Sequence, residues 1–301
     1  MPSPSRVAAT WAGIAAIVLW SSLALLTTLT ASLPPFQVLA TCFGIAGLAG
    51  VVWLRVRGGP DGLRVLRQPW PAFALALVAL FGYHALYLVA FRHAPAIEVN
   101  LINYLWPSLI VLFAALLLRA RLRAGQLAGT ALAFAGVLLL VTRGQGLALR
   151  WEFVGGYAAA LTAAVLWALY SVLNRRYAQV PSAAIVGVCL AVAAIAWATH
   201  HAIERPALPT PGQWLALVAM GLGPTGAAFL LWDRGTKSGD LALLGTLSYA
   251  APLLSTLSLL LVGRGDPHWS QAAAIALLLA GVAWSAHAGR DASASGDASV
   301  R

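Results

Sequence analysis

Residues 82–108 read GYHALYLVAFRHAPAIEVNLINYLWPS. The stretch is apolar enough to lie in a bilayer, yet it contains tyrosine, histidine, asparagine and tryptophan. Arg92-His93-Ala94-Pro95 divides it into two predicted helices, because proline interrupts helical hydrogen bonding. Hydrocarbon offers no hydrogen bonds, so polar side chains in a spanning helix face a partner helix or a cavity. The stretch therefore predicts a membrane protein with a polar, aromatic interior.

Helical periodicity predicts two polar faces in this stretch. Tyr83 and Tyr87 are four positions apart and share a face of the first helix. One stripe of the second helix collects residues at i, i+3, i+4 and i+7, namely Asn100, Asn103, Tyr104 and Pro107. We interpret both faces as lining one compartment within the membrane. The alternative is that these groups only join neighbouring helices.

The composition of the whole chain agrees with a membrane protein. It is 60% hydrophobic and 9% charged, whereas soluble domains carry about 25% charged residues. The net charge of +10 lies in short loops, as membrane insertion requires, so nucleic acid is not the expected partner. Cys42 and Cys189 each lie in a different apolar run, which indicates buried free thiols.

Charged residues and one Ser-Leu-Pro-Pro break divide the chain into apolar segments, each long enough for a span of about 20 residues. The sequence thus predicts an all-α membrane protein with ten transmembrane helices, bracketed by Arg6–Ser32, Pro35–Arg55, Arg67–Arg92, Glu98–Arg119, Arg123–Arg143, Glu152–Arg175, Arg176–Glu204, Arg205–Asp233, Asp240–Arg264 and Asp266–Arg290. Fourteen of the 19 Lys and Arg residues fall on the side of the N-terminus. This bias predicts both termini in the cytoplasm, in a bacterial inner membrane. Residues 289–301, rich in Ser, Ala, Asp and Gly, are predicted to be a disordered cytoplasmic tail.

The chain repeats itself after 145 positions. Tyr104 and Pro107 recur as Tyr249 and Pro252, and Ala135-Gly136-Val137 recurs near Gly281. The repeats are expected over residues 1–146 and 147–288, with five spans each. Because five is odd, the second repeat enters the membrane inverted, and a central cavity is expected at half-depth between the halves.

Pro107 and Pro252 lie near the middle of their spans. Each should free the carbonyl four residues back, at Asn103 and Ser248, and act as a hinge. The alternative is a static kink. Trp167 lies deep in its span, and the sequence favours neither of two placements for its ring, one facing the cavity and one facing the lipid.

His84 is the one acidic or basic side chain that the sequence places deep in a span. An ionisable group there is a functional candidate, whose neutral imidazole could donate to a substrate carboxylate. A core histidine is the alternative. No buried carboxylate is expected beside it, so facilitated diffusion is at least as consistent as proton coupling.

Other motifs carry little chemistry. Gly125 and Gly129 predict close packing of the fifth span, as scaffold. His200, His201 and His268 lack a carboxylate or cysteine at ligand spacing, so no metal is expected, and no motif predicts a cofactor.

The ten-span repeat and the Tyr-His-x-x-Tyr … Asn-Tyr-x-Trp-Pro pattern resemble the EamA-type branch of the drug/metabolite transporter superfamily, in particular the YddG-type aromatic amino acid exporters. The resemblance covers about residues 7–287. It implies a central cavity lined by Tyr83, His84, Tyr87, Tyr104, Trp106, Pro107 and Trp167. The second repeat has Pro224-Thr225-Gly226 in place of the Tyr-His cluster, so its site residues do not follow by symmetry.

We therefore expect a transporter that exports Phe, Trp and Tyr from the cytoplasm by alternating access. Asn100, Asn103 and His84 would bind the zwitterionic head, and Tyr249 would complete the site. The expected partners are a small amino acid and the bilayer, and the protein is expected to work as a monomer. The alternatives are another cargo on the same fold, such as other metabolites or aromatic cations, and a membrane enzyme or scaffold.

Overall fold

The computed structural model describes residues 4–119, 123–145, 149–263 and 266–298, and all regular structure in these ranges is helical. The α-helices are α1 (Pro4–Ser21), α2 (Leu23–Thr30), α3 (Pro35–Gly58), α4 (Trp70–His93), α5 (Ala96–Asn103), α6 (Trp106–Leu118), α7 (Ala124–Thr142), α8 (Val154–Leu173), α9 (Ile185–Ile203), α10 (Pro211–Met220), α11 (Ala228–Ser238), α12 (Leu241–Leu247), α13 (Ala250–Leu261) and α14 (Trp269–Ala298). Short helical segments adjoin them at η1 (Gly59–Leu66), η2 (Trp151–Phe153), η3 (Asn174–Tyr177), η4 (Ser182–Ala184) and η5 (Gly221–Ala227).

These elements combine into ten stretches that are long and apolar enough to cross a membrane, from Ser5–Thr30 to Trp269–Ala288. The predicted class, an all-α membrane protein with ten spans, is confirmed. Several spans begin where the sequence places proline in the first helical turn, as at Pro35 and Pro211, because the missing N–H is not needed there.

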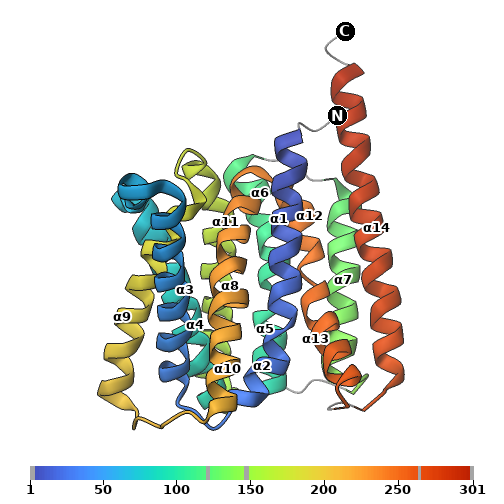
Figure 1. Ribbon diagram of the computed structural model, residues 1–301. Coiled ribbons are helices and arrows are strands. Elements are labelled where there is room, and N and C mark those ends of the chain that lie inside the picture. Colours follow the sequence, from blue (N-terminus) through green and yellow to red (C-terminus); the bar gives the residue numbers. More distant parts are fainter. Residues whose placement is uncertain (1–3, 120–122, 146–148, 264–265, 299–301) are drawn as a thin grey trace.

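Spans from the first and second halves of the chain are interleaved (Figure 1). The most extensive helix pairs are α7 with α14, α3 with α9, α1 with α11 and α4 with α8. Each pair takes one helix from before residue 146 and one from after it. The two halves therefore share one core, which supports the predicted repeat organisation. The start of α1 and the end of α14 lie at the same end of the bundle (Figure 1).

The α7–α14 pair packs backbone against backbone. A Cβ on Gly129 would lie 2.5 Å from the Gly281 carbonyl oxygen, and a Cβ on Gly281 would lie 2.5 Å from the Gly129 carbonyl oxygen. Only glycine allows this approach, a common device of membrane helix packing. Beside it, Thr130 bonds Thr246 and Thr246 bonds Ser285 through their hydroxyls, at 3.0 and 3.2 Å.

Four spans are interrupted, the first of them at Ser22, and the breaks in the fourth and ninth spans bear on the proline prediction. The fourth span breaks at Tyr104–Leu105 and the ninth at Ser248–Tyr249, each just before its proline. The carbonyl of Ser248 accepts a 3.1 Å bond from the amide of Ala251, so it is not the free acceptor that was predicted. The tight turn supplies this partner in place of the missing proline N–H. In the eighth span, η5 is a π-helix around Pro224.

The chain also continues as helix past two predicted ends. α11 runs through Asp233 to Ser238, because its charges are paired inside the protein, as described below. α14 continues to Ala298, where disorder was predicted from residue 289. Extension from an existing helix avoids the cost of nucleation, and this segment contains no proline. Residues 299–301 of the predicted tail lie outside the described part.

Candidate aromatic site

Rings from six spans meet between the helix pairs described above. We call this group the aromatic cluster, and it comprises Trp20, Phe43, Tyr83, His84, Trp106, Trp167, Phe229 and Trp232. Trp20 lies at its centre, with ring centroids 5.6 Å from Trp167, 5.1 Å from Trp232 and 5.9 Å from Phe229. Many pairs meet edge to face, the geometry that the ring quadrupoles favour. Trp167 is therefore inside the protein and does not face lipid.

Tyrosine and asparagine from the opening stretch meet beside this cluster. The Tyr83 ring stacks on Tyr87 at 5.7 Å and contacts Trp167 at 5.5 Å. Across to α5, Asn103 Nδ2 donates to the Tyr83 hydroxyl at 3.0 Å, and the Tyr87 hydroxyl donates to Asn100 Oδ1 at 2.5 Å. The two predicted polar faces thus meet each other. Tyr83, Tyr87 and Asn100 stay partly accessible, whereas Asn103 is buried.

His84 is held by its own helix. Its Nδ1 lies 2.6 Å from the carbonyl oxygen of Leu80, and its ring contacts Phe43 and Tyr83 edge to face. A carbonyl can only accept, so Nδ1 carries the proton and a neutral ring presents a bare Nε2. This corrects the expectation that a neutral His84 donates to a carboxylate. Its free nitrogen is an acceptor.

One predicted site residue lies elsewhere. Tyr249 is fully buried in a second apolar cluster with α7 and α14, where its hydroxyl meets Ser108 Oγ at 2.5 Å and its ring contacts Phe134. Tyr104 packs against the same cluster and also lies within electrostatic range of Tyr83 and Tyr87. The helix breaks at Tyr104–Leu105 and Ser248–Tyr249 end the periodicity that placed them on the predicted stripe. Trp106 contacts Trp167 and Trp232, and Pro107 is buried next to Gly245 of α12.

Sequence reasoning missed three rings of the cluster, Phe43, Phe229 and Trp232. Phe229 and Trp232 are three positions apart and share a face of α11, a signal that was available. Trp232 Nε1 donates to Ser171 Oγ at 3.1 Å, and Trp20 Nε1 donates to the carbonyl of Pro224 at 3.0 Å. The π-helix therefore anchors the central indole.

Buried charge was also missed. Asp233 and Lys237 form an ion pair of 2.8 Å whose side chains are only 4% and 6% exposed. Asn174 Nδ2 and the Tyr170 hydroxyl donate to Asp233 Oδ1 at 2.9 and 3.3 Å, and Lys237 donates to the Val180 carbonyl. Arg175 bonds the carbonyl of Gly239 nearby. These bonds join α8 and α11 at the end of the bundle that holds the termini.

A second buried carboxylate lies at the opposite end of the spans. Glu204 accepts from the amide of Phe36 at the start of α3 and lies 2.9 Å from His200 Nδ1 and 3.7 Å from Arg92. Asp233 and Lys237 lie within the eighth span, whose predicted end was Asp233, and Glu204 directly follows α9. A carboxylate at a helix N-terminus is stabilised by the free amides there.

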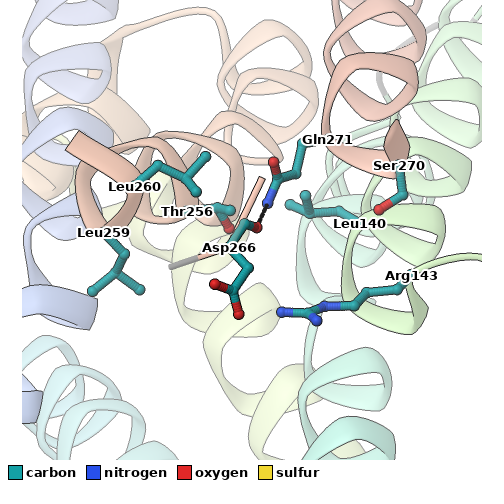
Figure 2. Close-up of a pocket in the computed structure, with 8 residues that line it drawn as sticks. All are labelled: Leu140, Arg143, Thr256, Leu259, Leu260, Asp266, Ser270 and Gln271. Atoms are coloured by element: carbon teal, nitrogen blue, oxygen red, sulfur yellow. Dashed lines mark hydrogen bonds between the residues drawn. The ribbon is translucent and has the colours of Figure 1, made fainter. Parts of the chain in front are cut away.

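Two cavities in the described part of the chain lie away from the predicted site. One, of about 230 Å³, lies among α7, α13 and α14 (Figure 2). Arg143 and Asp266 point into it, and Gln271 bonds the Asp266 carbonyl oxygen. The other, of about 350 Å³, is an apolar groove between α3, α9 and α11. The central cavity stays a prediction.

Comparison with known proteins gives this arrangement a context. The model of the EamA-like transporter family matches residues 7–142 and again residues 154–286. The chain belongs to the EamA-like transporter family. It is a multi-pass membrane protein of that family, and each match covers five of the ten spans.

Three relatives of this EamA-like chain share one name. The aromatic amino acid exporter YddG of Ancylobacter novellus is 48% identical over 280 residues, which is 93% of this chain and 97% of the relative. The aromatic amino acid exporter YddG of Escherichia coli K12 is 27% identical over 84% of this chain and 87% of its own. A crystal structure of a protein at 44% identity has a TM-score of 0.90, covering 95% of this chain and 99% of the other.

Proposed function

We propose that this EamA-like protein exports aromatic amino acids from the cytoplasm. The observation that carries the proposal is the aromatic cluster, in which eight rings from α1, α3, α4, α6, α8 and α11 lie next to paired asparagines and tyrosines. An aromatic cargo would replace ring–ring contacts there, each of about 0.5–1.5 kcal/mol. The names of the relatives support the same cargo.

The proposed mechanism is alternating access. The site comprises Tyr83, His84, Tyr87, Asn100, Asn103, Trp106 and Trp167, and we include Trp20, Phe229 and Trp232 because their rings contact Trp167. The breaks beside Pro107 and Pro252 and the π-helix of the eighth span are the places where helix halves can bend, because their backbone bonding is already irregular. The halves of residues 1–146 and 147–288 would rock about this centre.

The proposal also covers the orientation of the protein in the membrane and its oligomeric state. Both termini would lie in the cytoplasm of a bacterial inner membrane, as the excess of Lys and Arg on that side favours. The protein would act as a monomer, without a metal or cofactor, and would leave its cargo chemically unchanged.

Counterflow of labelled Trp in proteoliposomes tests the function. Tyr83→Ala, His84→Ala and Trp167→Ala should each lower exchange at least tenfold, because each removes a ring or polar group of the site. Trp151→Ala is the matched control: Trp151 is 89% exposed, so this change should leave exchange intact. Unchanged exchange in all three site variants would refute the proposed site, and the absence of exchange in the unaltered protein would refute the cargo.

A further inference from the structure

One polar atom beside the aromatic cluster has no partner. Asn103 is 3% exposed, and its Nδ2 donates to the Tyr83 hydroxyl at 3.0 Å. The other end, Oδ1, is buried and has no hydrogen-bond partner among the described residues. An unpaired buried carbonyl is unfavourable, so a group that donates to it would be bound preferentially.

A second polar atom of the cluster is also an acceptor. His84 donates from Nδ1 to Leu80, which leaves Nε2 with its lone pair. The Tyr83 ring links the two groups, because it contacts the His84 ring at 5.2 Å and its hydroxyl bonds Asn103. Asn103 Oδ1 and His84 Nε2 can therefore each accept a hydrogen bond from a donor group on a bound cargo.

Positive charge is absent from this neighbourhood in the described part of the chain. The cation–ring contact found among the described residues joins Arg150 to Phe153, outside the cluster, and the side-chain bonds of Asn100 and Asn103 go to tyrosines. Lys237 is bound to Asp233 and the Val180 carbonyl, and Arg175 to the carbonyls of Thr236 and Gly239. A carboxylate would find no cation, which is its usual partner in a buried site.

We infer that the site recognises the ammonium group of its cargo, through Asn103 Oδ1 and His84 Nε2, and does not require the carboxylate. The faces of the surrounding Tyr and Trp rings add attraction for a cation. This inference rests on the proposed function and extends it to a second substrate class, primary aromatic amines. Aromatic acids that lack an amine are excluded.

Two analogues of Trp separate the head groups. Tryptamine keeps the amine and lacks the carboxylate, whereas indole-3-propionate keeps the carboxylate and lacks the amine. Against labelled Trp counterflow, tryptamine should compete within about tenfold of unlabelled Trp, and indole-3-propionate should be at least 100-fold weaker. Equal competition by the two analogues, or stronger competition by the acid, would overturn the inference while leaving aromatic amino acid exchange established.

Variants at Asn103 locate the preference. Asn103→Leu removes the acceptor and should reduce the ratio between the two analogues at least tenfold. Asn103→Asp keeps an oxygen there and should retain or increase the ratio. An unchanged ratio in Asn103→Leu would show that another group reads the ammonium. If Asn103→Leu does not fold, a ratio that falls in Asn103→Asp overturns the assignment by itself.

Binding measured without transport keeps the two proposals apart. Thermal unfolding of the purified protein in detergent, with tryptamine or indole-3-propionate added, reports affinity directly. Stabilisation by tryptamine alone, without Trp counterflow, would support the amine site and refute amino acid export. Stabilisation by neither analogue, without counterflow, would refute both.

Discussion

At the scale of single residues, protein stability should be most sensitive to substitution of Asp233 or Lys237, because both charges of this ion pair are removed from water. A buried charge is tolerated when it is paired and hydrogen-bonded. Asp233 has Lys237, Asn174 and Tyr170 as partners, and Lys237 also has a carbonyl. Either charge alone would be left without compensation.

Lys237→Met should therefore destabilise the protein by about 3–5 kcal/mol, the usual cost of breaking a buried pair from one side. Asp233→Asn in the same chain should recover much of the loss, since no charge then remains. Thermal unfolding in detergent measures both. Arg64→Met, which breaks the exposed pair of Arg64 and Asp61, is the control and should have no measurable effect. Equal effects of Lys237→Met and Arg64→Met would show that burial is not the cause.

The same pair shows where sequence reasoning at this scale ends. In an apolar sequence a charge marks the end of a span, and Asp233 was read in this way. Its partners come from α8, about 60 positions earlier, and no local pattern reveals that they neutralise it. Helical spacing, in contrast, could predict the two polar faces that meet when Tyr83 contacts Asn103 and Tyr87 contacts Asn100.

At the scale of helices, the close approach of α7 and α14 depends on glycine. The G-x-x-x-G of the fifth span predicted such packing, and the structure identifies the partner as Gly281. Which helix would lie opposite could not be predicted from periodicity, since it depends on how the two halves interleave.

Gly129→Ala should lower stability by about 1–3 kcal/mol, because the added methyl would overlap the Gly281 carbonyl and push the helices apart. Gly155→Ala in α8 is matched to it, since a Cβ there meets nothing within 4 Å and alanine favours the helix. The two unfolding temperatures, compared with that of the unaltered protein, give the answer. A tolerated Gly129→Ala would mean that this helix pair can separate without cost.

The sequence predicted the positions of the helix breaks only to within a few residues. Proline predicted an irregularity in the fourth and ninth spans, and one is present in each. The break lies two to four residues before each proline, however, and it turns Tyr249 into the second apolar cluster, against which Tyr104 also packs. A stripe drawn through an uninterrupted helix cannot anticipate this turn.

At the scale of the whole molecule, the ten spans could be predicted from the spacing of charges and the length a bilayer requires. The orientation in the membrane is a further prediction from the asymmetry of Lys and Arg. It can be tested with single cysteines in a chain whose own Cys42 and Cys189 are replaced by alanine.

Leu208→Cys should react in intact cells with a maleimide that cannot cross the membrane, because Leu208 is 97% exposed in the loop between the seventh and eighth spans, on the predicted outer side. Asp61→Cys lies on the opposite side and should react only after the cells are opened. The reverse pattern would place both termini outside.

The interleaving of the halves has a consequence for the history of such a chain. Each of its principal helix pairs joins an early span to a late one. A five-span fragment released from its counterpart would expose to lipid the flanks of α1, α3, α4 and α7 that now touch their partners. In the predicted inverted-repeat arrangement, a five-span ancestor would gain a folded interior only by pairing with a second copy of opposite orientation, and a fusion of the two copies would make that pairing permanent.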